Sequence, residues 1–258
     1  MNRRQVLRCL AAVLGAVATG GCTGRSDREP ALDVEPVSDP PPVTGDPAAS
    51  PPRTPEQPPL EERTATPAAA PVAVRSVVCR ADWAASAPTG PYRRHTIERL
   101  TVHHTAVVND DPSRQPDLLR RHQRNHQARG FVDLAYHLVI AGDGTVYEGR
   151  AVTAVGETFT DYDPAGHFLP CLEGNFDRQE PSGAQLAALA DVLAWAAVTF
   201  GVPPETIRGH RSFAATRCPG DALQRLVDDG SLERWVTERI AAGGVRLELT
   251  CGGALAVT

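Results

Sequence analysis

Apolar and polar positions alternate with two different periods after residue 98, which predicts both strands and helices. Residues 99–106 (RLTVHHTA) are a short β-branched run, typical of a buried strand. Residues 134–150 contain an apolar run, the turn Gly142-Asp143-Gly144 and a second apolar run, the pattern of a β-hairpin. The tail, residues 245–258, begins with alternating residues that predict one further strand with a loose end.

Helical spacing appears in three other stretches. Residues 115–130 have the spacing of a helix that stops at Gly130. The residues that fall on one face of this helix are Leu118, Leu119, His122 and His126. Residues 181–202 form a clear amphipathic helix with Ser182 as its N-cap, and its apolar positions are Leu186, Leu189, Val192, Leu193 and Ala196. Residues 221–244 predict one or two closing helices. Strands mixed with helices indicate an α/β domain.

The N-terminus has the pattern of an export signal. A basic start is followed by an apolar stretch from Val6 to Ala18, too short for a membrane span of about 20 residues, and then by small residues up to Cys22. Arg3-Arg4 resembles a twin-arginine signal, and TGGC resembles a lipoprotein processing site. We therefore expect residues 1–22 to direct export, with Cys22 either lipidated as the only membrane attachment or left as a free or discarded thiol.

Composition separates residues 23–74 from the rest. Thirteen of the 23 prolines lie between residues 29 and 72, in a stretch almost without aromatic or long apolar side chains. Such a stretch buries too little apolar surface to offset its ordering entropy, so we expect a disordered, Pro-rich linker. Residues 75–258 then form one domain. The net charge of −5 supplies no basic patch, which argues against nucleic acid as a partner.

Four cysteines remain after the signal: Cys79, Cys171, Cys218 and Cys251. In an oxidising compartment, unpaired thiols are a liability, and four cysteines allow three complete pairings. Cys79 and Cys251 lie near the two ends of the domain, so a bridge between them would join the termini. If Cys218 holds a metal, at most one bridge forms among the other three.

The segment GHRSFAATRCPG places His210 and Cys218 eight positions apart, ahead of a Pro-Gly stop. A catalytic zinc site uses three protein ligands and leaves one position open. The strand at 99–106 offers His103 or His104 as the third ligand, but only one of them can face a given site because successive strand side chains alternate. A capping histidine and a buried thiol are the alternative interpretation.

Four ordered blocks resemble zinc-dependent N-acetylmuramoyl-L-alanine amidases and the related peptidoglycan recognition proteins. They are RADWAA (80–85), TVHHTA (101–106), HQARGFVDLAYHLVIAGDGTVYEGR (126–150) and GHRSFAATRCPG (209–220). The resemblance covers residues 78–228. It implies a central mixed β-sheet flanked by helices, a zinc ion in a cleft that binds the glycan and stem peptide of peptidoglycan, and hydrolysis of the amide between N-acetylmuramic acid and L-alanine in the cell envelope.

The resemblance also implies a role for each matching position. His103, His210 and Cys218 match the family's zinc ligands. Tyr136 matches a catalytic tyrosine, and Thr216 matches a threonine or lysine that contacts the reacting group. A zinc-bound water as nucleophile and a tyrosine hydroxyl as oxyanion donor would suit this set.

The remaining histidines have simpler interpretations. We expect His104 to face away from the site, His122 and His126 to support their helix, and His137 to be a satisfied core residue. Asp133 is expected to organise the turn before Tyr136.

The chain departs from the family pattern after residue 156. Thr158 stands where a histidine is usual, Asp163 replaces an asparagine, and Gly166-His167-Phe168 replaces a serine-isoleucine step. Cys171 occupies the position of a glutamate found in some relatives. Because such positions tend to line the groove, we expect an altered substrate preference and an intact metal site.

Two further functions stay open from the sequence. The domain could bind peptidoglycan without cleaving it, although receptors of the family usually lack the cysteine that Cys218 provides. It could also act on a different acyl-amino bond, since the groove is altered.

Overall fold

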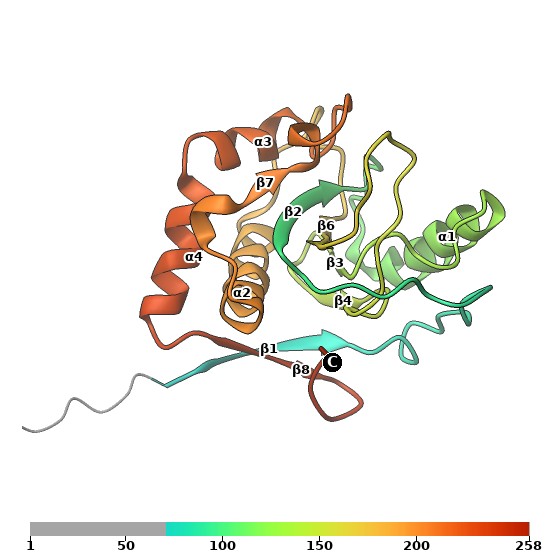
Figure 1. The fold of residues 1–258 in the computed structure, drawn as a ribbon, viewed down its shortest axis with the longest axis horizontal. Helices are drawn as coiled ribbons and strands as arrows, with labels where there is room; N and C mark the ends of the chain where they lie inside the picture. The colour runs from blue at the N-terminus through green and yellow to red at the C-terminus, as the bar shows by residue number, and fades with distance from the viewer. Residues whose placement is uncertain (1–70, 258) are drawn as a thin grey trace, which may run out of the picture. The chain divides into compact units, whose positions relative to one another are not determined.

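The computed structural model describes residues 71–257 (Figure 1). The eight strands are β1 (Ala73–Val78), β2 (Arg99–His104), β3 (Leu138–Ile140), β4 (Val146–Glu148), β5 (His167–Phe168), β6 (Pro170–Leu172), β7 (Arg208–Gly209) and β8 (Val245–Leu249). The helices are α1 (Gln115–Ala128), α2 (Gly183–Phe200), α3 (Asp221–Asp228) and α4 (Ser231–Ala241), with short 3₁₀ turns at Pro112–Arg114, Pro204–Thr206 and His210–Ser212. The expected export signal, and residues 23–70 of the expected linker, lie outside the described residues.

The strands form a single mixed sheet, which confirms the predicted fold class. The order is β5-β2-β6-β3-β4-β1-β8, and β7 also pairs with β2. The hairpin of β3 and β4 is antiparallel as predicted, whereas the other described pairs are parallel. The sheet therefore joins segments that are far apart in the sequence, and β2 collects β5, β6 and β7 around itself.

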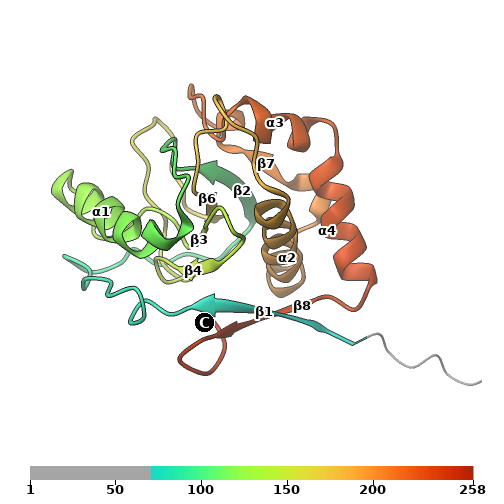
Figure 2. The same cartoon turned by 180° about the vertical axis from the view of Figure 1, so that it is seen from behind.

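Helices cover both faces of the sheet. In Figures 1 and 2, α1 lies on the opposite side of the central strands from α2 and α4. Alternation along β3 explains this division, because Leu138 and Ile140 join the core beneath α2 while Val139 joins a second core with Leu119 of α1. Two apolar layers therefore hold the sheet between the helices.

Helix α2 forms as its sequence predicts. Ser182 is the N-cap of a capping box with Gln185, and Gly201 ends the helix in the left-handed conformation with a φ of 66°. By length and composition α2 could span a membrane, but 56% of that stretch is buried inside the domain. It is the central core helix.

Several element boundaries differ slightly from the sequence predictions. The strand expected at 99–106 ends at His104, and the helix expected to stop at Gly130 ends at Ala128. The closing region forms two helices, because Gly230 adopts a φ of 74° between them. Tyr136 and His137, which were expected on a strand, come directly before β3.

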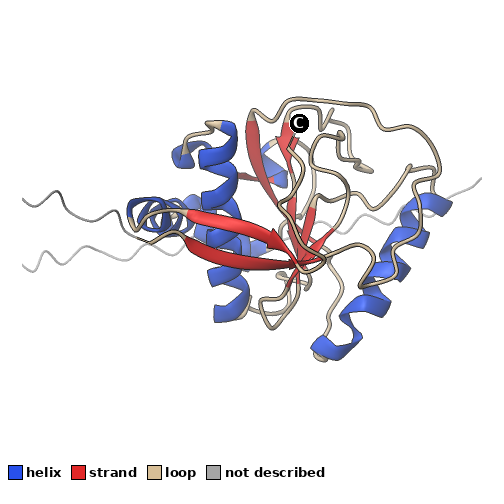
Figure 3. Cartoon of the chain, turned by 90° about the horizontal axis from the view of Figure 1, so that it is seen from below, coloured by secondary structure: helices blue, strands red, loops and turns tan. Residues whose placement is uncertain are grey.

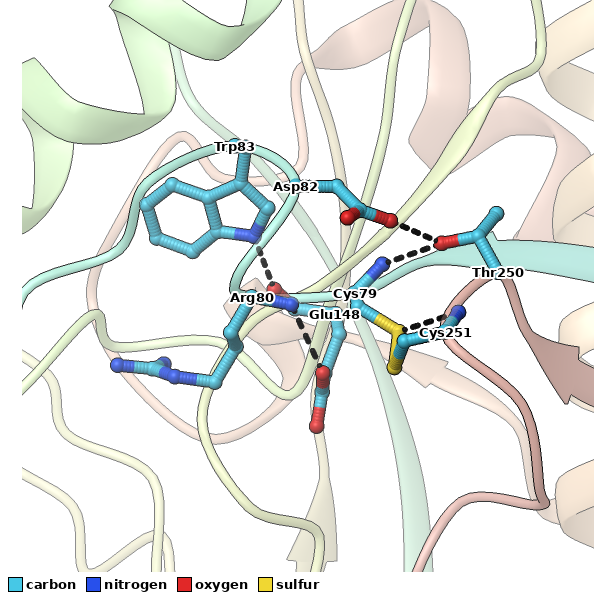
Figure 4. The surroundings of a disulfide bond; sticks show 7 residues. All are labelled: Cys79, Arg80, Asp82, Trp83, Glu148, Thr250 and Cys251. Atoms are coloured by element: carbon cyan, nitrogen blue, oxygen red, sulfur yellow. Dashed lines mark hydrogen bonds between the residues drawn. A yellow bond between two sulfur atoms is a disulfide. The ribbon is translucent and has the colours of Figure 1, made fainter.

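The two ends of the domain are joined at the edge of the sheet. Strands β1 and β8 pair in parallel, and in Figure 3, seen from below, they run side by side in the foreground. Cys79 and Cys251 form a disulfide just beyond them, and the Cys79 amide donates to Thr250 Oγ1 at 3.0 Å (Figure 4). Strand β1 includes Ala73 and Val74, placed in the linker from sequence, because their backbones pair with β8.

Trp83 packs beside this junction. Its ring is fully buried, and its indole N–H donates to the carbonyl of Glu148 at 2.8 Å (Figure 4). The first residues of the domain are thereby anchored to β4 as well as to β8.

Candidate metal centre and active site

Strand pairing brings the three predicted metal ligands together. His103 is the fifth residue of β2, and β7 pairs with β2 so that Val102 lies opposite Gly209. His210 follows Gly209 and therefore emerges beside His103. The Arg211 amide donates to the Cys218 carbonyl at 3.0 Å, which closes the intervening loop and returns Cys218 to the same place.

The three ligand atoms lie close enough together to hold one metal ion. Nδ1 of His103 lies 3.5 Å from Sγ of Cys218, and one ligand atom from each of the three residues lies within 4.8 Å of the others. Zinc bonds of about 2.0–2.1 Å to nitrogen and 2.3 Å to sulfur put tetrahedral ligands roughly 3.5 Å apart. The residues present therefore fit a zinc ion and leave one coordination position for water or substrate.

His103 needs an additional partner. Its ring is buried, and among residues 71–257 its Nε2 atom has no hydrogen-bond partner. A buried polar group without a partner costs about 1–3 kcal/mol. Among residues 71–257, its other ring nitrogen, Nδ1, contacts one polar atom, the sulfur of Cys218. Nδ1, which faces the sulfur of another proposed ligand, is therefore the nitrogen that could bind a metal, while Nε2 would carry the ring proton.

Burial sets the protonation of the ligands. Burial, assisted by the neighbouring His210, holds the pKa of His103 well below its usual value, and burial lowers the pKa of His210 to about 4. Both rings are therefore neutral at pH 7 and offer a lone pair. Burial raises the pKa of Cys218 to about 12 without a metal, so metal binding would displace the thiol proton.

Tyr136 stands next to the ligand cluster. Its ring centroid lies 5.4 Å from that of His103 and 5.9 Å, edge-on, from that of His126. Burial, together with the neighbouring Cys171 and Cys218, raises the pKa of Tyr136 well above its usual value. The phenol therefore keeps its proton at neutral pH and can donate a hydrogen bond.

All five residues predicted from the sequence line one cavity. This cavity of about 350 Å³ is bordered by His103, Tyr136, His210, Thr216 and Cys218. The Thr216 hydroxyl oxygen accepts from the Cys218 amide at 3.2 Å, which leaves its own proton free to be donated. A second cavity of about 400 Å³ is also lined by Phe131, Glu157 and Thr158, so the two cavities are neighbours, and together they are called the groove below.

The other histidines are held by the protein. His104 accepts from the Phe176 amide at 3.3 Å, and His137 bonds the Ala154 carbonyl at 2.8 Å and the Leu169 amide at 2.9 Å. Asp133 accepts from the Leu134 amide and organises the turn, as expected.

The two histidines of α1, His122 and His126, have different surroundings. Nε2 of His122 meets the Glu173 carboxylate at 3.1 Å. His126 accepts from the Ala135 amide at 3.1 Å, while its ring borders the groove beside Tyr136.

Two residues that border the groove, Phe159 and Thr160, had no signal in the sequence, unlike Thr158. Phe159 stacks on Phe131 at 4.1 Å between ring centroids, and the Arg129 guanidinium lies 3.3 Å from the Phe159 ring centroid. The hydroxyl of Thr160 lies 2.8 Å from Nε2 of His210. Thr158, Phe159 and Thr160 all border the groove, in the region that departs from the family pattern.

Comparison with known proteins supports the same interpretation. The family described as N-acetylmuramoyl-L-alanine amidase (Amidase_2) matches residues 93–221. N-acetylmuramoyl-L-alanine amidase of Sus scrofa is 37% identical over 134 residues, which are 50% of this chain and 22% of the pig protein. This chain therefore matches only about a fifth of the pig protein's length.

Smaller proteins match over most of their length. Peptidoglycan-recognition protein SD of Drosophila simulans is 32% identical over 161 residues, which are 58% of this chain and 83% of that protein. The crystal structure of Drosophila peptidoglycan recognition protein SD superposes with a TM-score of 0.54 and 29% identity, covering 61% of this chain and 94% of that one. With the match to residues 93–221, these similarities show that the chain belongs to the N-acetylmuramoyl-L-alanine amidase family, together with the peptidoglycan recognition proteins.

Proposed function

We propose that this protein is an exported, zinc-dependent hydrolase that cleaves the amide between N-acetylmuramic acid and L-alanine in peptidoglycan. The observation that carries the proposal is the convergence of His103, His210 and Cys218 with Tyr136 and Thr216 around one cavity. Family membership alone does not decide between hydrolysis and recognition, because both kinds of protein are among the relatives.

The proposed ligands would set the charge of the centre. Two neutral imidazoles and one thiolate would leave a zinc ion with a net charge of +1, which suits a neutral amide substrate. Bound zinc would supply a Lewis acid and a water molecule activated at neutral pH.

The protein's own groups would act on the substrate. The Tyr136 hydroxyl, protonated at neutral pH, would donate to the oxygen on which negative charge develops, and Thr216 would add a second, weaker donor. The two neighbouring cavities of the groove would hold the substrate on either side of the amide, with the stacked rings of Phe131 and Phe159 at its border.

Digestion of purified peptidoglycan tests the proposal. We expect the purified protein to release new L-alanine amino termini, and we expect chelator and the variant Cys218→Ser to abolish this release. The variant Ser212→Ala, exposed on the same loop, is the matched control and should cleave normally. Release of a different amino terminus would favour another acyl-amino bond.

A recognition protein is the second candidate, because the relatives include peptidoglycan-recognition protein SD. It predicts tight binding to peptidoglycan with no bond cleaved, even when zinc is supplied. The presence of Cys218 in the ligand cluster favours hydrolysis.

Export and lipidation are proposed from the N-terminal sequence. The Cys79–Cys251 disulfide supports an oxidising location, where such bonds persist. Labelling with a radioactive fatty acid should mark the wild-type protein and Cys9→Ala but not Cys22→Ala. An unlabelled wild type would rule out the lipid anchor while leaving export possible.

A further inference from the structure

A short run of hydroxyl groups connects the groove to His210. Oγ1 of Thr160 lies 2.8 Å from Nε2 of His210 and 2.7 Å from Oγ1 of Thr158. The amide of Thr160 also donates to Oγ1 of Thr158 at 3.2 Å, which is a local turn formed by a threonine side chain. Both threonines border the cavity of the candidate metal centre.

We propose that Thr160 is a positioning residue for the metal centre, which holds His210 in the form that binds metal through Nδ1. In this arrangement the Nε2–H of His210 donates to Thr160 Oγ1, and the Thr160 hydroxyl in turn donates to Thr158 Oγ1. The inference rests on the zinc site of the proposed function, since it assigns the nitrogen by which one of its ligands binds.

The choice of nitrogen follows from the hydrogen-bonding capacity of the groups. A neutral imidazole has one N–H and one lone pair, so a ring that binds metal through one nitrogen carries its proton on the other. Nε2 of His210 is already in contact with Thr160. A metal at Nε2 would have to displace this hydroxyl, whereas Nδ1 is left for the metal.

The Thr160 hydroxyl oxygen can accept a hydrogen bond from His210, because the hydroxyl proton of Thr160 has an acceptor of its own in Thr158. A hydroxyl has one proton and two lone pairs, and Thr158 Oγ1 can accept from both the amide and the hydroxyl of Thr160. The three groups then form a run in which each donor has one acceptor.

Two neighbouring aromatic rings also restrain the plane of the His210 ring. The ring of Tyr162 lies 5.2 Å from that of His210, and the ring of His103 lies 4.5 Å from it. Thr160 therefore sets the rotation of a ring that is packed by aromatic neighbours. A hydrogen-bond partner of a ligating histidine typically contributes 10- to 100-fold to metal affinity.

Zinc affinity of the full-length protein tests the proposal. Competition with a chelating indicator should show zinc binding weakened by about 10- to 100-fold in Thr160→Val, which keeps the shape and removes the hydroxyl. Thr160→Ser, which keeps the hydroxyl, should stay within about threefold of the wild type. The control Thr237→Val alters an exposed threonine on α4 and should bind zinc as the wild type does.

A second measurement observes the His210 ring directly, without a metal. Nitrogen-15 spectra of the metal-free wild type should show His210 protonated on Nε2, and this preference should weaken in Thr160→Val. Protonation on Nδ1 in the wild type would overturn the proposal, as would undiminished zinc affinity in a correctly folded Thr160→Val. A wild type that binds no zinc would overturn the proposed function together with this inference, whereas a loss confined to Thr160→Val supports both.

Discussion

Nε2 of His122 lies 3.1 Å from the carboxylate of Glu173, and the Glu173 side chain is fully buried. The same carboxylate accepts from Gln115 Nε2 and from the Thr105 hydroxyl, each at 2.9 Å. Burial alone would raise the pKa of Glu173, but these hydrogen bonds outweigh burial and hold the pKa below its usual value. One carboxylate thereby joins α1 to Thr105, which directly follows β2.

Removing this carboxylate should destabilise the domain strongly. Glu173→Ala removes the acceptor of the buried Gln115 and of the half-buried His122 and Thr105, and we expect the free energy of unfolding to fall by about 3–5 kcal/mol. Urea denaturation at pH 7 measures the loss. The matched control is Glu180→Ala, which removes an exposed ion pair with Arg225 and should cost about 1 kcal/mol or less. Equal losses in the two variants would contradict the importance of the buried network.

Acid should unfold the domain partly through His137. Burial lowers the pKa of His137 to about 3, and its Nδ1 accepts from the Leu169 amide, so the native ring is neutral. The unfolded ring, with a pKa of about 6.5, binds a proton that the native ring does not. Stability from this group is therefore complete above pH 6.5 and decreases by about 1.4 kcal/mol per pH unit as the pH falls toward 3.

Comparison of two proteins isolates this contribution from that of the other histidines. Between pH 7 and 5, the free energy of unfolding should fall less steeply with decreasing pH in His137→Asn than in the wild type. The difference in slope should approach about 1.4 kcal/mol per pH unit, which corresponds to one bound proton. The variant starts from a lower stability at pH 7, so the slopes rather than the absolute values are compared. Identical slopes would show that the native ring already binds the proton.

The long, regular elements could be predicted because their signals are local. The Ser182 cap and the apolar face of residues 186–196 lie within one helix, and the structure has that helix. Strands β5, β6 and β7, with two or three residues each, are too short to show any period. They form because β2 lies beside them, which no local pattern contains.

In the site, too, some residues could be predicted from local sequence patterns and others could not. Alternation on β2 limited the third ligand to one of two histidines, but only the family resemblance selected His103, and the pairing of β2 with β7 explains the choice. Thr160 could not be predicted, because it reaches His210 across 50 residues through a loop that departs from the family pattern. Its role depends on a distance of 2.8 Å rather than on a recurring motif.

The disulfide should stabilise the fold without taking part in the metal centre. Cys79 and Cys251 are separated by 172 residues, so the bond restricts nearly the whole domain when it is unfolded. The double variant Cys79→Ser/Cys251→Ser should lose about 2–5 kcal/mol in its free energy of unfolding and still bind zinc. Dithiothreitol should lower the melting temperature of the wild type but not that of the double variant. A shift of similar size in both proteins would show that the reductant does not act through this disulfide.

Tyr136→Phe should separate zinc binding from turnover. The ring would still pack beside His103 and His126, and Tyr136 is absent from the ligand cluster, so zinc content should not change. Loss of a donor to the developing oxyanion should slow peptidoglycan cleavage by roughly 100- to 1000-fold. The control Tyr147→Phe alters a buried phenol on β4 that does not border the groove and should leave the rate unchanged. Metal analysis and release of L-alanine amino termini would be measured on the same samples, and an unchanged rate in Tyr136→Phe would remove the tyrosine from the mechanism.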